Sequence, residues 1–89
     1  IVLVDRILDW EVAGFDALDA SHFAVFETLD LEIVLLGTGA KQRIPHPRLT
    51  AKLAQAGIGV EVMDLQAACR TYNILVAEEP KVAAALLFG

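Results

Sequence analysis

The 89-residue sequence has a single cysteine and only two histidines, which excludes several classes of small protein. One cysteine cannot form an internal disulfide, so the fold cannot depend on such bridges. The single cysteine and the two isolated histidines also lack the spacing that the ligands of a zinc site have. We therefore predict no metal, no other cofactor and a location in a reducing compartment, with the cytoplasm as the default.

Positive charge and long apolar runs are also scarce. Seven lysines and arginines face twelve acidic residues, for a net charge of −5, whereas a nucleic-acid-binding protein needs a basic face. The longest apolar run, 82–88, is far shorter than the roughly 20 residues of a membrane span. Residues 1–4 are too short for the core of a signal peptide, and no basic residue precedes them. We expect neither nucleic acid nor a membrane span.

The residues present have the composition of one small folded domain, which we assign to 1–89. Hydrophobic residues make up 56% of the chain and charged residues 21%. The chain starts without methionine inside a predicted strand, so we expect its native N-terminal segment to be missing. In a eukaryotic protein, such a segment could carry a mitochondrial address.

Apolar patterning and capping residues predict alternating strands and helices. Asp19 and Asp64 can cap helices, Pro47 suits a first helical turn, and Gly57 suits a left-handed helix end. Pro80 cannot continue a helix. The expected strands are 1–4, 8–12, 31–36 and 60–63, and the expected helices are 20–28, 47–56 and 65–76. The final apolar segment, 82–88, is a helix or a buried strand, and we favour the strand. This order predicts an α/β protein with a largely parallel sheet.

Two strings of residues carry a resemblance to a known family. Leu35-Leu36-Gly37-Thr38-Gly39 follows the central strand, and Met63-Asp64 precedes Ala68-Cys69-Arg70-Thr71-Tyr72-Asn73. The chain resembles the Mth938-like domain family, a domain of unknown function whose relatives include an adipogenesis-associated protein and a mitochondrial complex I assembly factor. The resemblance implies a three-layer α/β fold, with a mixed, mostly parallel sheet flanked by helices. It implies no established enzymatic activity.

The Gly37-Thr38-Gly39 turn is the first candidate for a binding site. Gln42 stands where a dinucleotide fingerprint needs its third glycine, and no serine or threonine follows Lys41 as a phosphate-binding loop requires. The turn is either a structural corner or a shallow nest of backbone N–H groups that binds an anion beside Arg43. Ligands bind at such strand ends in open α/β sheets.

Other polar residues could extend this site. Glu61 would lie near the interior if helices cover both faces of the sheet, and an ion pair with Arg70 or Arg43 would then satisfy it. Arg70, Thr71 and Asn73 depart from the apolar stripe of their helix, so they either line a polar pocket or form a solvated face. Cys69 falls on that stripe, which predicts a buried and inert thiol. No catalytic residue is predicted.

Two functions remain open. We favour a non-enzymatic protein-interaction or assembly-factor-like domain, whose partner binds an apolar patch or the basic stretch 41–52. Residues 33–60 hold four basic residues and no acid, while 1–32 hold eight acids and one base. The alternative is a domain that binds a small ligand or anion, which could be an unrecognised enzyme. Its pocket would comprise Gly37, Thr38, Gly39, Arg43, Glu61, Arg70, Thr71 and Asn73.

Overall fold

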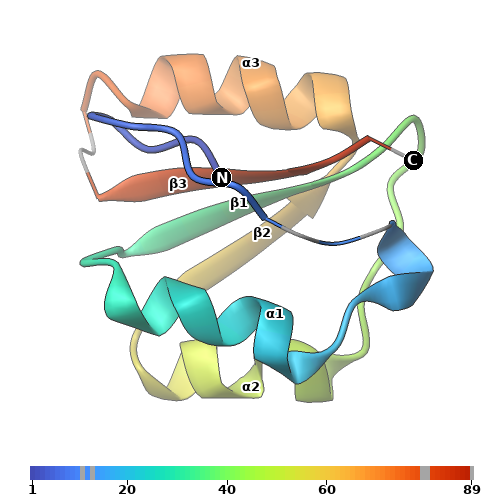
Figure 1. Cartoon of the computed structure of the whole chain (residues 1–89). Helices are drawn as coiled ribbons and strands as arrows, with labels where there is room; N and C mark the ends of the chain where they lie inside the picture. Colours follow the sequence, from blue (N-terminus) through green and yellow to red (C-terminus); the bar gives the residue numbers. More distant parts are fainter. Residues whose placement is uncertain (11, 13, 79–80, 89) are drawn as a thin grey trace.

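Three parallel strands form one sheet between two layers of helices (Figure 1). The structure is a computed structural model that describes residues 1–10, 12, 14–78 and 81–88. The strands are β1 (Ile33–Thr38), β2 (Gly59–Met63) and β3 (Val82–Leu87), in the order β2-β1-β3. The helices are α1 (Ala20–Ala24), α2 (Pro47–Gln55) and α3 (Leu65–Leu75), with 3₁₀ turns η1 (Phe15–Ala17) and η2 (Val25–Thr28). Helix α3 covers one face of the sheet, and α1 and α2 cover the other. The predicted three-layer α/β class is confirmed.

Helices α1 and α3 begin directly after the capping residues that the sequence predicted, Asp19 and Asp64. Asp19 accepts the backbone N–H of Ser21 at 2.9 Å, and His22 Nδ1 accepts the backbone N–H of Asp19 at 3.0 Å. Asp64 accepts the N–H of Ala67 at 2.8 Å at the start of α3. The final turns of the first predicted helix, 20–28, are 3₁₀ rather than α. Pro80, the predicted stop after α3, lies outside the described residues.

Aromatic residues form the core between the sheet and α1. Phe23 and Phe26 are buried, and the Trp10 ring meets them edge-on at 5.9 and 5.6 Å between centroids. The Trp10 indole N–H donates to the carbonyl of His22 at 2.9 Å, so its polar atom is satisfied. Val34 and Leu36 complete this core from β1. Burial of these side chains holds the short α1 helix in place, because five residues cannot form a stable helix alone.

The predicted strands at 1–4 and 8–12 are wrong. Val2 forms only isolated antiparallel bridges, to Ile7 and to Ala84 of β3. The chain reverses at once, since the N–H of Leu3 donates to the carbonyl of Arg6 at 2.9 Å, and this tight turn leaves no length for a ladder. No strand includes residues 8–10 or 12, and Glu11 is outside the described part of the chain. The resulting hairpin, residues 1–8, supplies the antiparallel component at the outer edge of β3.

Strand β1 extends further than predicted. Gly37 and Thr38, expected in the turn, are buried residues of β1, paired with Leu86 and Leu87 of β3. Neighbouring strands on both sides satisfy the backbone here, so the ladder continues through the glycine. The turn itself starts at Gly39.

Candidate functional site

Thr38 organises the loop that leaves the carboxyl end of β1. Its side chain is buried, and its hydroxyl donates to the carbonyl of Lys41 at 2.6 Å. The same oxygen accepts the backbone N–H of Arg43 at 3.0 Å. Gly39 adopts a φ of 86°, a left-handed conformation that favours glycine, and its carbonyl accepts the N–H of Leu65 at 2.7 Å. The Arg43 N–H is therefore used within the loop, and the Gly39 carbonyl ties the loop to the start of α3.

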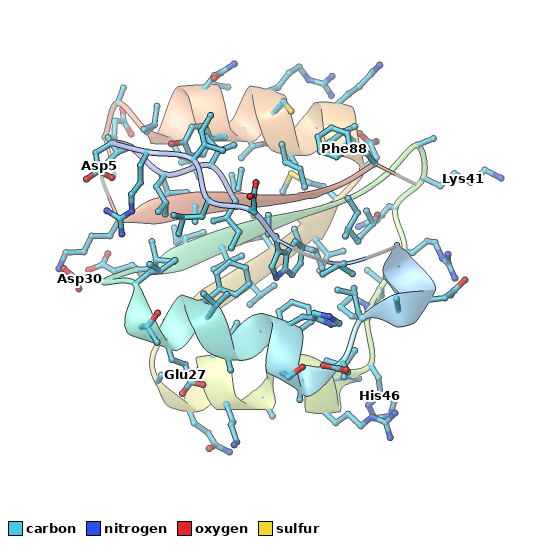
Figure 2. The ribbon with its side chains drawn as sticks, viewed as in Figure 1. Asp5, Glu27, Asp30, Lys41, His46 and Phe88 are labelled. Atoms are coloured by element: carbon cyan, nitrogen blue, oxygen red, sulfur yellow. The ribbon has the colours of Figure 1, made fainter. Side chains whose placement is uncertain are left out.

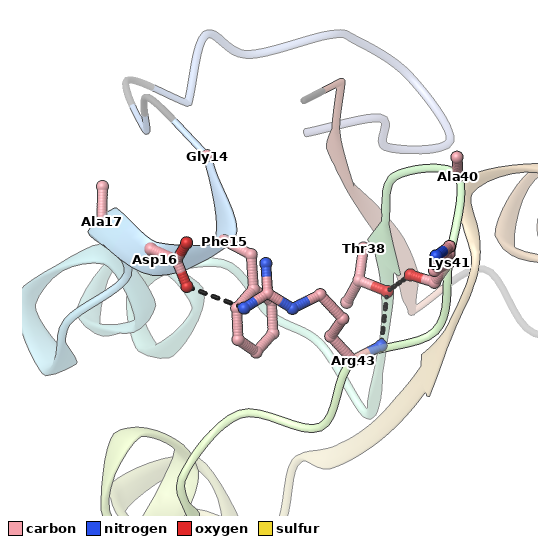
Figure 3. A pocket seen from close by; sticks show the side chains of 8 residues that line it. All are labelled: Gly14, Phe15, Asp16, Ala17, Thr38, Ala40, Lys41 and Arg43. Atoms are coloured by element: carbon pink, nitrogen blue, oxygen red, sulfur yellow. Dashed lines mark hydrogen bonds and ion pairs between the residues drawn. The ribbon is translucent and has the colours of Figure 1, made fainter.

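Arg43 reaches from this loop to η1. Its guanidinium carbon lies 4.2 Å from the centre of the Phe15 ring, and Nη2 donates to Asp16 Oδ1 at 2.8 Å (Figure 3). The side chains of Arg43 and Asp16 are 49% and 86% exposed. An ion pair this exposed contributes about 0–1 kcal/mol to stability, because water screens it. The contact orients the guanidinium rather than holding the fold together.

An open cavity of about 550 Å³ lies between η1 and this loop. We call it the loop cavity; it is lined by Gly14, Phe15, Asp16, Ala17, Thr38, Ala40, Lys41 and Arg43. Its charged groups are two cations and one carboxylate, on a protein that is acidic as a whole. It is therefore a local positive region.

The eight predicted site residues do not line one cavity. Thr38 and Arg43 line the loop cavity, and Gly39 lines a neighbouring hollow of about 450 Å³. Gly37 is buried beneath α3. The remaining four line neither of these two hollows: Glu61, Arg70 and Asn73 are exposed, and Thr71 is half-buried.

The expectation that Glu61 lies near the interior is wrong. Helix α3 packs mainly on β1 and β3, so the α3-side face of β2 stays open and Glu61 is exposed. No ion pair with Arg43 or Arg70 forms among the described residues, because a solvated carboxylate needs none. Cys69 is also exposed rather than buried. Ala68 is the buried residue of α3, and the next position points about 100° away from it around the helix.

A second surface was missed by the sequence analysis. A cavity of about 370 Å³, which we call the edge groove, lies between the N-terminal hairpin and the end of β3. Exposed Ile7 (77%) and Phe88 (81%) flank it, and Trp10 and Leu86 contribute to its lining. The sequence predicts Phe88 in the final strand and Ile7 in no element, and only the fold shows that both side chains face solvent. Figure 2 shows Phe88 at the same end of the molecule as Lys41.

Neither a metal centre nor a membrane helix is found in the part of the chain that the structure describes. No group of three or more metal-binding side chains comes together there. No described helix has the length and apolar character to cross a bilayer.

A family profile for proteins of unknown function (DUF498/DUF598) matches residues 1–87. The chain belongs to the DUF498 family. One curated relative is NADH dehydrogenase [ubiquinone] 1 alpha subcomplex assembly factor 3 of Danio rerio, 36% identical over 97% of this chain and 51% of its own length. Another is the 13 kDa major membrane protein of Francisella tularensis, 30% identical over 98% of this chain and 72% of its own length. The chain spans about half the length of the assembly-factor relatives that it matches.

Solved structures of similar proteins share this fold. A crystal structure from Bordetella parapertussis superimposes with a TM-score of 0.86 at 40% identity, over 94% of this chain and 72% of that one. A solution structure from Bordetella pertussis, described as a Mth938-like domain, gives a TM-score of 0.80 at 32% identity, over 92% and 67% of the two chains. The resemblance inferred from the sequence is confirmed.

Proposed function

We propose that this DUF498 domain is a non-enzymatic protein-interaction module of the assembly-factor kind. The observation that carries the proposal is the edge groove, a hollow flanked by the exposed apolar side chains of Ile7 and Phe88. Scattered apolar residues are normal on a protein surface, but large side chains around a hollow are the usual anchors of a protein partner. Similarity to complex I assembly factors along nearly the whole chain supports the same role.

The groove is suited to a protein segment for a second reason. Strand β3 is an edge strand, and Val2 pairs with it only at Ala84. Alternate residues of an edge strand point their backbone N–H and C=O groups away from the sheet. Ala84 uses these groups to pair with Val2, and Leu86, two residues further along β3, points its N–H and C=O groups outward beside the groove. A partner could therefore combine apolar contacts with backbone hydrogen bonds at this edge.

Affinity purification from cells of the source organism tests the role. We compare the wild-type full-length protein with Ile7→Ser and Phe88→Ser, using Ile74→Ser as the matched control. Ile74 is 70% exposed but lies on α3, outside the groove. We expect wild type and Ile74→Ser to retain one specific partner, and each groove variant to recover about tenfold less, equivalent to about 1.4 kcal/mol.

Circular dichroism must first show that all variants fold alike. Recovery of the same proteins by all four forms would contradict the proposal, as would recovery of no specific partner by wild type.

A further inference from the structure

The loop cavity holds two cationic side chains, one without an ion pair among the described residues and one paired with a single exposed carboxylate. Lys41 is exposed and forms no ion pair among the described residues. Arg43 has five N–H donors in its guanidinium, and a single hydrogen bond joins that group to Asp16. The other N–H groups of the Arg43 guanidinium therefore remain available in the cavity to donate hydrogen bonds to an anion.

The contact with Asp16 shows that the Arg43 guanidinium binds a carboxylate in this setting. Its carboxylate meets the guanidinium at 2.8 Å while the Phe15 ring supports the guanidinium from its face. Asp16 is 86% exposed, so little holds it against a competing or additional carboxylate. The chain thus contains a local example of carboxylate recognition at Arg43 (Figure 3).

The surroundings of the two cations are apolar. Phe15, Ala17 and Ala40 line the same cavity, so a ligand that fits it combines a carboxylate with an adjacent apolar group. An acidic side chain next to an apolar one in a polypeptide has this chemistry.

The hollows at this end of the molecule are neighbours that share lining residues. Ala40 lines both the loop cavity and the neighbouring hollow, and Phe88 lines both that hollow and the edge groove. They lie near the carboxyl end of the sheet, where Thr38 of β1 pairs with Leu87 of β3. A polypeptide is long enough to contact neighbouring hollows, whereas a small ion would rely on screened charges alone.

We propose that the loop cavity binds an acidic side chain of a partner protein, with Lys41 and Arg43 receiving the carboxylate and Phe15 packing against its apolar neighbour. The inference rests on the proposed function and names the chemistry of the partner. The two cations of the cavity, on a protein of net charge −5, give the partner's acidic segment a local region of favourable charge.

Titration of the full chain with a blocked peptide, acetyl-Gly-Leu-Glu-Phe-Gly-amide, tests this. Backbone amide shifts of the ¹⁵N-labelled protein report the position of binding, and the glutamine version of the peptide is the matched ligand. We expect shifts centred on Thr38, Lys41 and Arg43, with binding about fivefold weaker for the glutamine peptide. Lys41→Ala should weaken binding of the glutamate peptide about threefold to fivefold, and added salt should weaken it further.

Arg48→Ala is the control for charge. Arg48 is an exposed base on α2 that does not line the loop cavity, so its loss should leave the affinity within about twofold. Equal affinity for the two peptides, or shifts centred elsewhere, would overturn the proposal. If sodium acetate alone produced the same shifts at the same concentration, the cavity would be a free-anion site and not a docking site. A negative result here alongside a groove-dependent partner would leave the proposed function intact and reject only this cavity.

Discussion

At the scale of single residues, Gly37 sets how closely α3 approaches the sheet. A Cβ at this position would lie 3.0 Å from the Ala68 Cβ and 3.3 Å from the Leu65 Cα. Both are fixed parts of α3, so Gly37→Ala forces the helix outward, and we expect a loss of about 1–3 kcal/mol in unfolding free energy by urea denaturation. Gly59→Ala is the control, because its nearest neighbour is 3.7 Å away, an ordinary contact. Equal stability of the two variants would contradict this packing argument.

Asp19 predicts a second residue-scale effect, on acid stability. Its pKa lies below the ordinary value of 3.8, chiefly through the Ser21 hydroxyl and then the backbone N–H groups of Ser21 and His22, against an opposing effect of desolvation. A lowered folded-state pKa stabilises the protein above the unfolded pKa, and this contribution disappears as the pH falls through the folded pKa. The affected window is therefore below 3.8.

Asp19→Asn should remove this part of the pH dependence, because asparagine still caps the helix but does not titrate. The measurement is the unfolding free energy in urea at several values between about pH 4 and about pH 2. We expect a shallower decline for the variant than for wild type. Parallel declines would show that the cap does not contribute to acid sensitivity.

At the scale of elements, the N-terminal hairpin covers part of the β3 edge through one residue. The N–H of Val2 donates to the carbonyl of Ala84 at 2.8 Å, and the N–H of Ala84 returns a bond at 3.0 Å. Val2→Pro removes the first of these donors, whereas Val2→Ala keeps it. We expect Val2→Pro to lose about 1 kcal/mol beyond Val2→Ala in unfolding free energy and to associate more at high concentration in light scattering. Equal unfolding free energies and equal light scattering of the two variants would mean that the Val2 hydrogen bond does not protect the β3 edge.

The elements also show why some predictions held and others failed. The strands at 33–38, 59–63 and 82–87 lie within about two residues of expectation, because compact apolar runs bounded by caps and glycines leave little choice. The run at 1–4 is also apolar, but it forms one arm of the N-terminal hairpin, and the predicted strand at 8–12 does not form in its described residues. A short apolar segment becomes a strand only if a neighbour extends alongside it, and sequence pattern alone does not supply that neighbour.

At the scale of the whole molecule, the candidate site was predicted only in part. Thr38 and Arg43 come together, because both belong to the short loop at the end of β1. Arg70 and Asn73 do not join them, because their helix presents them to solvent. Residues that are close in sequence stay close in any fold. Whether a residue on another element joins them depends on how that element is rotated and placed.

The sequence by itself determined the α/β class, the order of its main elements, their caps and the basic middle of an acidic chain. These follow from local rules of periodicity, capping and charge, which each segment carries within itself. The tertiary structure alone decided that α3 leaves Glu61 uncovered, that Ile7 and Phe88 face solvent, and that three hollows with shared lining residues lie near the carboxyl end of the sheet. The physical reason is that exposure depends on which elements pack against each other, and distant parts of the chain set that packing together.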